Sequence, residues 1–322
     1  MTDPSFPHLH PKVGAIAALP ERARRRYIQR PKFVPTAEAV KALETLERLY
    51  THQRTHRLLN VMIIGETNLG KTTIFEEMQK RHRGSNSPRR EFPFAPLLKV
   101  EMAWWPKPQS LYDQILMPLQ LQYGIKFDAK APFAEKESDV IYWLAKLKVK
   151  ILFIDEAQNF GRRPSLTEAF MQALIMLNNA LRITICLIGL ESTANVVNSH
   201  PQSANRFAPF RLARWRSADD PGFLDFIDTY EGLLPLREES RLTSPAIRNF
   251  IFDNSEGVLG EAVDLMHKAA ERALGGSERI RLDELQAVGF VPPRARPAAT
   301  RPPADAEGVE EKDENAEGAV VA

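Results

Sequence analysis

The sequence predicts an α/β fold in which a parallel β-sheet is covered by helices on both faces and is followed by a small helical domain. Short apolar runs alternate with segments of helical periodicity through the first two thirds of the chain, as in β-strand–helix–β-strand units. A glycine-containing loop directly follows the first of these runs. From about Asp219 onward, the apolar residues recur mainly at helical spacing.

The N-terminal residues 1–35 are predicted to form a basic arm. They contain several prolines, so we expect an extended segment with one short helix near residues 21–27. The basic cluster can contact nucleic-acid phosphates, but a solvated arm and a docking site on a partner fit the charge equally well. It consists of Arg22, Arg24, Arg25, Arg26, Arg30 and Lys32.

The core and the lid follow in order. Thr36 suits the N-cap of a helix that extends to about His56. Four apolar runs predict buried strands, at 58–64, 95–102, 150–154 and 183–189, and the intervening helices are expected at 73–81, 111–123, 138–146 and 166–181. These elements define a core over residues 36–218. Helices expected at 224–234, 244–254 and 260–274 define a helical lid over residues 219–290, and the Pro-, Ala- and Glu-rich residues 291–322 are predicted to be a disordered tail.

The loop after the first strand carries the strongest functional signal. It fits the phosphate-binding pattern G-x-x-x-x-G-K-[ST] and lies between a strand and a helix. Its backbone N–H groups can surround a phosphate, and the helix N-terminus adds favourable partial charge. We expect Lys71 to contact the β- and γ-phosphates of ATP and Thr72 to hold Mg²⁺. The residues expected to bind the nucleotide are Gly65, Glu66, Thr67, Asn68, Leu69, Gly70, Lys71, Thr72 and Thr73.

A second signal follows the third apolar run, which ends in two carboxylates. Asp155 and Glu156 should lie at the carboxyl edge of the sheet, where ligands bind in open α/β folds. Asp155 is expected to hold the Mg²⁺ shell, and Glu156 is expected to polarise the attacking water as a general base. Together with the loop, this pair predicts Mg²⁺-dependent ATP hydrolysis.

Composition limits the remaining possibilities. The chain has 322 residues, of which 43% are hydrophobic, and its one cysteine, Cys186, excludes an internal disulfide framework. We find neither a signal peptide nor an apolar run long enough to span a bilayer, so a cytoplasmic protein without a membrane partner is expected. The net charge of +2 hides an acidic stretch at residues 291–322 and a basic remainder.

A P-loop core followed by a helical lid points to the AAA+ class of ATPases. In this class an arginine after the fourth strand reaches the γ-phosphate held by a neighbouring subunit and stabilises the transition state. Arg206 is the first choice, with Arg211 and Arg214 behind it, and the alternative is that all three are surface or DNA-facing arginines. Residues 257–263 lack the arginine with which many AAA+ lid helices touch the nucleotide, which puts sensing by the lid in doubt but not ATP binding.

The chain resembles the TniB family of transposition proteins and, more broadly, the TnsC-like regulators of transposons. The resemblance covers roughly residues 10–290 and is carried by 27–36, 65–72, 154–158, 205–215, 226–237 and 255–261. It implies an ATP-dependent accessory factor that assembles on duplex DNA as a ring or filament and marks a target site. Such a factor recruits or activates the transposase, works with a targeting accessory protein, and does not itself cut or join strands.

Residues near the second strand are candidates for contact with DNA. Lys99, Lys107 and Lys126 lie in or near this region, although ordinary surface lysines are the alternative reading. The neighbouring Trp104 and Trp105 suit a stack against DNA, core packing or a protein interface. Two other function classes stay open: a AAA+ loader or remodeller acting on a protein such as a replicative helicase, and a P-loop kinase or signalling ATPase. The arginine after strand four and the lid argue against the last class.

Overall fold

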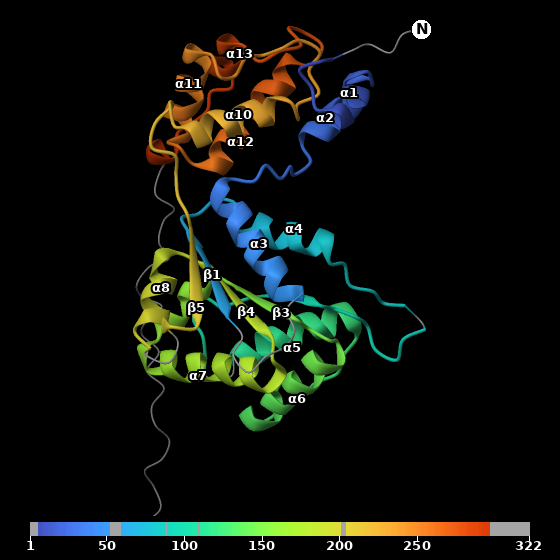
Figure 1. Cartoon of the computed structure of the whole chain (residues 1–322), viewed down its shortest axis with the longest axis vertical. Helices are drawn as coiled ribbons and strands as arrows, with labels where there is room; N and C mark the ends of the chain where they lie inside the picture. Colours follow the sequence, from blue (N-terminus) through green and yellow to red (C-terminus); the bar gives the residue numbers. More distant parts are fainter. Residues whose placement is uncertain (1–5, 52–58, 88, 108–109, 201–203, 297–322) are drawn as a thin grey trace, which may run out of the picture.

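The structure is a computed structural model that describes residues 6–51, 59–87, 89–107, 110–200 and 204–296 (Figure 1). Its core is a five-stranded parallel sheet with the strand order β2-β3-β4-β1-β5, which confirms the predicted fold class. Since all strands are parallel, their carboxyl ends meet at one edge. The strands are β1 (Asn60–Gly65), β2 (Leu97–Glu101), β3 (Ile151–Asp155), β4 (Thr184–Gly189) and β5 (Phe207–Leu212).

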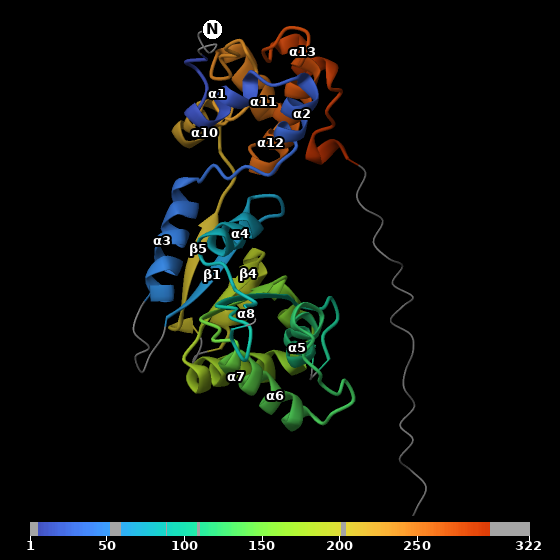
Figure 2. The ribbon, with the colours of Figure 1, turned by 90° about the vertical axis from the view of Figure 1, so that its right-hand side faces the viewer.

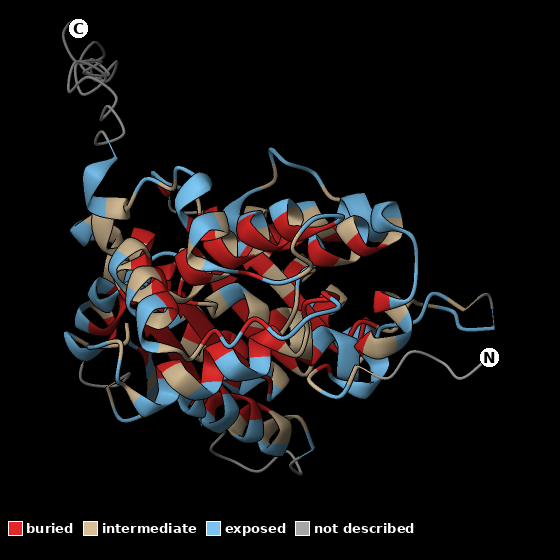
Figure 3. Ribbon diagram, turned by 90° about the horizontal axis from the view of Figure 1, so that it is seen from above, coloured by how far each residue is buried: buried red, intermediate tan, exposed pale blue. Residues whose placement is uncertain are grey.

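Helices cover both faces of the sheet, because alternate residues of each strand point to opposite faces. Val61 and Ile63 pack toward α3 and α4, whereas Met62 and Ile64 pack toward the helices of the other face. Figure 3 shows that the buried residues, in red, lie in the sheet and on the inward surfaces of these helices. The helices are α3 (Ala37–Thr51), α4 (Lys71–Arg81), α5 (Ser110–Tyr123), α6 (Phe133–Lys146), α7 (Pro164–Leu181) and α8 (Glu191–Asn198).

The lid is a separate cluster of helices at one end of the molecule (Figures 1 and 2). It has its own apolar core, which Trp215 of the connecting segment joins through its rings' contacts with Phe223 and Phe226. The predicted lid helices are present, and the structure adds α13. The lid comprises α10 (Pro221–Glu231), α11 (Pro245–Ser255), α12 (Leu259–Ala273) and α13 (Leu282–Ala287).

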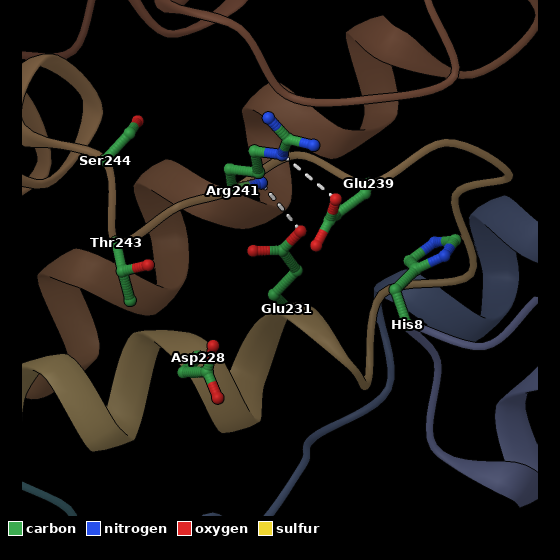
Figure 4. Close-up of a pocket in the computed structure, with 7 residues that line it drawn as sticks. All are labelled: His8, Asp228, Glu231, Glu239, Arg241, Thr243 and Ser244. Atoms are coloured by element: carbon green, nitrogen blue, oxygen red, sulfur yellow. Dashed lines mark hydrogen bonds and ion pairs between the residues drawn. The ribbon is translucent and has the colours of Figure 1, made fainter.

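A polar cavity inside the lid is lined by residues from α10 and the following loop together with His8 (Figure 4). Its central carboxylate, Glu231, accepts backbone N–H groups from Ser240, Arg241 and Leu242 at 2.6, 2.9 and 2.8 Å. These bonds satisfy the buried acid and fix the loop between α10 and α11. The central acid of this cavity therefore has a structural role in the lid.

The N-terminal segment contains the short helix expected near residues 21–27, but it is less extended than the sequence suggested. It forms two helices, α1 (Pro11–Ala17) and α2 (Glu21–Ile28), which pack on the lid (Figure 2). Ile28 is fully buried in the lid core, and Leu9, Val13 and Ala17 form a smaller apolar cluster with Leu233 nearby. The reason is their spacing, because apolar residues four apart share one face of a helix.

Two members of the basic cluster of this segment are held by contacts within the protein. Arg24 is 2% exposed and forms a two-pronged ion pair with Glu278 at 2.5 and 2.8 Å. Lys32 donates to the carbonyls of Tyr27 and Ile28 at the end of α2, at 2.9 and 2.7 Å. Within the predicted basic arm, Arg24 therefore fastens α2 to the lid, and Lys32 caps the end of α2.

The predicted tail differs from expectation at its start. Residues 291–296 are described and include the short 3₁₀ helix η2 (Pro293–Ala295); Arg294 within it and Arg296 directly after it contact lid glutamates. The rest of the predicted tail, residues 297–322, lies outside the described residues. Within the described part of the chain, none of the helices has the length and apolar character needed to cross a membrane.

Candidate nucleotide-binding site

The loop between β1 and α4 has the backbone of a phosphate cradle. Asn68 and Gly70 adopt left-handed conformations, with φ of 67° and 83°, and glycine takes such a conformation without steric cost. Gly65 lies so close to β5 that a Cβ atom there would be 2.7 Å from the carbonyl oxygen of Leu212. These constraints turn the chain directly into the N-terminus of α4, where unpaired N–H groups favour an anion.

Lys71 lies inside this loop. Its Nζ donates to the carbonyl oxygens of Gly65 and Glu66 at 2.8 and 2.6 Å. Burial lowers the pKa of Lys71 below its usual value, while the carboxylates of Asp155, Glu156 and Glu66 oppose this shift. The ammonium group therefore shares the carboxyl edge of the sheet with both acids predicted after β3.

Two hydroxyls follow in the first turn of α4. Thr72 is exposed at the start of the helix, where its side chain is open to a ligand. Thr73 instead donates from Oγ1 to the carbonyl oxygen of Gly70 at 2.5 Å, which stabilises the left-handed turn. The two adjacent threonines thus differ in what their hydroxyls can do.

The acids after β3 are held by different partners. Asp155 is 8% exposed; its Oδ1 accepts the Glu156 N–H at 3.0 Å and its Oδ2 lies 2.7 Å from Lys99 Nζ. Glu156 is in a left-handed conformation, with φ of 55°, which costs free energy in a residue other than glycine. Its Oε2 accepts a hydrogen bond from Gln158 Nε2 at 2.7 Å.

Gln158 connects this acid to the tip of β4. Its Oε1 accepts the N–H of Leu190 at 3.2 Å, directly after that strand. Gly189 makes the approach possible, because a Cβ there would lie 2.5 Å from Gln158 Oε1. Sequence reasoning assigned Gln158 no role, and it left the residue at the tip of strand four unassigned. The structure brings the two positions together through one amide side chain.

The three lysines proposed for DNA contact fall in different places. Lys99 projects from β2 toward the candidate nucleotide site, where its Nζ lies 2.7 Å from Asp155 Oδ2. Lys107 and Lys126 are exposed. Trp104 and Trp105 are 63% and 58% exposed, so the alternative of core packing is wrong for both. The guanidinium of Arg162 lies 3.1 Å from the ring centroid of Trp104, and that of Arg163 lies 5.9 Å from Trp105.

The three candidate arginines are spread along strand β5, with Arg206 before it, Arg211 within it and Arg214 after it. Arg206 precedes β5, and its carbonyl oxygen accepts the N–H of Asn60 at the start of β1, 2.8 Å away. Because β5 rises about 3.3 Å per residue, the phosphate loop at its far end is roughly 20 Å away. Arg206 is half-buried, and its Nη1 lies 3.4 Å from Asn179 Oδ1 at the edge of the sheet opposite its own loop.

The other two arginines lie beyond Arg206 along the strand. Arg211 forms an exposed ion pair with Glu191 at 3.0 Å. Arg214 follows the end of β5 and lies at the phosphate loop, where its Nε donates to Glu66 Oε2 at 2.8 Å. Of the three, Arg214 is therefore next to its own loop, whereas Arg206 lies at the opposite edge of the sheet.

A cavity of about 440 Å³ adjoins the loop where the N-terminal segment, the core and the lid meet. Apolar side chains form much of its wall, and the carboxylates of Asp220 and Asp225 add polar groups. This combination suits a flat heterocyclic ring attached to a phosphate group in the loop. The apolar wall is formed by Val34, Leu69, Leu212, Trp215, Phe226 and Leu259.

The donor set also fits a magnesium ion. The Thr72 hydroxyl and the Asp155 carboxylate are hard oxygen ligands, and Mg²⁺ usually takes one or two protein ligands together with phosphate oxygens and water. Among the described residues, no cluster of three or more His, Cys, Asp or Glu side chains can hold a metal by itself. A metal at this edge would therefore depend on phosphate oxygens.

Comparison with known proteins supports the fold and points to a family. A family model described as "Bacterial TniB protein" matches residues 24–217. The structure resembles the Aeropyrum pernix ORC2 protein in its ADPNP–ADP complexes, with a TM-score of 0.58 and 18% identity over 82% of this chain and 71% of that chain.

Two further structures are similar. The Aeropyrum pernix ORC1 protein in complex with DNA has a TM-score of 0.57 and 17% identity over 82% of this chain and 68% of that one. Cdc6p from Pyrobaculum aerophilum has the same TM-score and identity over 82% and 70%. At these identities the likeness shows the fold alone. No curated protein sequence matches the chain.

Proposed function

The chain belongs to the TniB family, and from this premise we propose that it is an ATP-dependent, DNA-binding regulator of transposition. In this proposal it hydrolyses Mg²⁺-bound ATP, assembles with copies of itself on target duplex DNA, and recruits or activates a transposase together with a targeting accessory protein. One observation carries the proposal: Lys71 in its glycine loop shares the carboxyl edge of the sheet with Asp155 and Glu156.

The residues of the site divide the work of hydrolysis. The N–H groups of the loop and the α4 N-terminus bind the phosphates, and Lys71 exchanges its carbonyl partners for phosphate oxygens. Thr72 and Asp155 hold the metal, which neutralises charge on the transferring phosphate when bound. Glu156 orients the attacking water and accepts its proton. Gln158 holds the Glu156 carboxylate in place from the tip of β4.

The position of Arg206 is the reason to propose that the protein acts as an oligomer. Its position at the edge opposite its own phosphate loop supports action on the nucleotide of an adjacent subunit, where it would stabilise the transferring phosphate. ATP at such an interface favours the assembled state, because the arginine binds the γ-phosphate only there. Hydrolysis removes that contact and loosens the assembly.

Exposed cations and aromatics support contact with DNA. Lys107, Lys126 and the pair Trp104–Arg162 lie on the surface, and an assembly would repeat them along the duplex. Repeated phosphate contacts add up, so binding should depend steeply on salt. The same exposed tryptophans also suit a protein surface, which keeps a AAA+ loader or remodeller of a partner protein as the second candidate.

The size of the assembly and the ATPase rate, each measured with and without duplex DNA, separate these candidates. We expect ATP and DNA together to produce oligomers in sedimentation and to raise the hydrolysis rate severalfold, because DNA brings Arg206 to a neighbour's nucleotide. Lys71→Ala serves as the control that removes the nucleotide. Assembly and hydrolysis that are both indifferent to DNA would overturn the DNA-binding proposal in favour of the protein remodeller.

A further inference from the structure

The segment that follows the lid is joined to the phosphate loop by polar contacts. Arg296 Nη1 donates to Glu261 Oε1 at 3.0 Å, and its Nη2 makes a second, short contact with Glu261 Oε2. Glu261 lies in the first turn of α12, and its Oε1 also accepts a hydrogen bond from Asn68 Nδ2 in the loop at 3.1 Å. One carboxylate thus links the C-terminal segment to the phosphate loop.

A second link runs in parallel through Glu256. Arg294 donates its backbone N–H to Glu256 Oε1 at 3.0 Å, and its Nε lies 3.3 Å from Glu256 Oε2. The same Oε2 lies 3.6 Å from Arg214 Nη1, and Arg214 is paired with Glu66 of the loop. Glu256, directly after α11, and Glu261, in the first turn of α12, therefore each face the loop on one side and a C-terminal arginine on the other.

The start of α12 touches the loop directly. The N–H of Gly260 donates to the carbonyl oxygen of Asn68 at 2.9 Å. A Cβ atom on Gly260 would lie 2.1 Å from Asn68 Oδ1, so a side chain at this position would displace the Asn68 amide. Asn68 is held there in a left-handed conformation, which persists only where the surroundings fix it.

Charge gives these contacts a consequence for the nucleotide. Glu66, Glu256 and Glu261 place three carboxylates beside a loop proposed to bind a triphosphate, and like charges at short range repel. The hydrogen bond from Arg296 lowers the pKa of Glu261, so this acid is ionised at neutral pH. Arg214, Arg294 and Arg296 match the three acids. Two of these three arginines come from the C-terminal segment.

We propose that Arg296, assisted by Arg294, is a positioning residue for ATP binding. It acts through Glu261, where it offsets the negative charge that faces the triphosphate and holds α12 against Asn68. The inference rests on the proposed ATP binding of the loop. Residues 257–263, at the start of α12, contain no arginine that could offset this negative charge. In the inference, the C-terminal segment supplies that arginine.

The two arginines contribute unequally. Arg294 is 85% exposed, and an ion pair open to solvent contributes little. Arg296 binds both oxygens of Glu261, whose side chain is 11% exposed, and such two-pronged pairs are the stronger kind. We therefore expect most of the effect to depend on Arg296.

Titration of the full-length protein with fluorescent ATP and ADP analogues, without DNA, tests this inference. Arg296→Ala should weaken ATP binding about fivefold to tenfold, within the usual range of coupling between sites. ADP binding should weaken less, because the diphosphate carries less charge. Arg294→Ala should change ATP binding by about twofold at most. Arg272→Ala is the matched control: this exposed arginine lies in the last turn of the same helix.

A second substitution separates positioning from general stability. Glu261→Gln keeps an oxygen for Asn68 but removes the charge, so adding it to Arg296→Ala should restore much of the lost ATP affinity. Wild-type affinity in Arg296→Ala, or no recovery in the double variant, would overturn the inference. Wild-type protein that binds neither analogue would instead contradict ATP binding itself, so the two failures are distinguishable.

Discussion

At the scale of residues, the site depends on how individual side chains are held. Glu156 can act as a base only if its carboxylate is held in one orientation. Its left-handed backbone conformation is uncommon for a residue with a side chain. Gln158 fixes this carboxylate and anchors itself to the N–H of Leu190. The residue after β4 therefore positions the proposed base. Strand β4 lies between β3, which carries the base, and β1, which leads into the phosphate loop.

Substitutions of Lys71 and Glu156 should separate binding from hydrolysis. Lys71→Ala should abolish ATP binding, because the loop loses the cation that faces the phosphates. Glu156→Gln should bind ATP but slow hydrolysis at least about a hundredfold, since general base catalysis contributes on this order. Equilibrium binding and single-turnover hydrolysis measure the two effects. Normal hydrolysis by Glu156→Gln would remove Glu156 from the role of base.

The sequence predicted the chemical residues of the site better than their partners. The loop and the acids after β3 are recognisable because each motif is local in the chain. Lys99 is 56 positions before Asp155, and their ion pair follows from the pairing of β2 with β3, which no local pattern specifies. The Asn68–Glu261 contact depends in the same way on how the lid docks.

At the scale of elements, the N-terminal helices act as part of the lid. Ile28 and Val34 belong to the lid core, and Arg24 forms a buried ion pair with Glu278. The sequence suggested an extended arm because prolines and arginines dominate its composition. Periodic apolar positions in α1 and α2 determine the observed packing instead.

Arg24→Met should destabilise the protein by about 3 kcal/mol, because Glu278 loses its partner in a mostly buried position. Arg24 lowers the pKa of Glu278 below its ordinary value of 4.5. A lowered pKa in the folded state stabilises the protein above the unfolded-state value and loses that effect as pH falls through the folded-state value. The stability difference between wild type and variant should therefore shrink below about pH 4.

Thermal unfolding across pH 7 to 3.5 measures this difference, with the exposed neighbour Arg22→Met as control. An equal difference at both ends of the range would show that the ion pair is not its cause.

Strand β5 and helix α8 were missed for a physical reason. Pro209 lies within β5, and proline in a strand is tolerated mainly at a sheet edge, which is where the structure places it. The burial of successive residues alternates along β5, so this strand lacks the continuous apolar run by which the other strands are recognised. α8 has eight residues, too few to establish helical periodicity.

At the scale of the whole molecule, the two halves of the proposed catalytic site lie at opposite edges of one sheet. Each subunit carries a phosphate loop at the carboxyl ends of the strands and Arg206 at the other ends. One molecule cannot bring them together, whereas a head-to-tail assembly can. Under the proposed function, the oligomer would be required for hydrolysis as well as for binding DNA.

Mixing two inactive variants tests this arrangement. Arg206→Ala should hydrolyse ATP about a thousandfold more slowly than wild type. Glu156→Gln should hydrolyse it about a hundredfold more slowly. An equal mixture on DNA should recover about a quarter of wild-type activity, because random head-to-tail neighbours pair an intact base with an intact arginine at that frequency. A mixture no more active than its components would place the arginine elsewhere, with Arg214 as the next candidate.

The most direct measurement is binding to a labelled, random-sequence DNA duplex with a non-hydrolysable ATP analogue, with ADP and without nucleotide. We expect tight DNA binding only in the presence of the ATP analogue, with an affinity that falls steeply as the salt concentration increases. Equal binding, or none, in all three states would contradict an ATP-dependent assembly on DNA and would favour a remodeller of a partner protein.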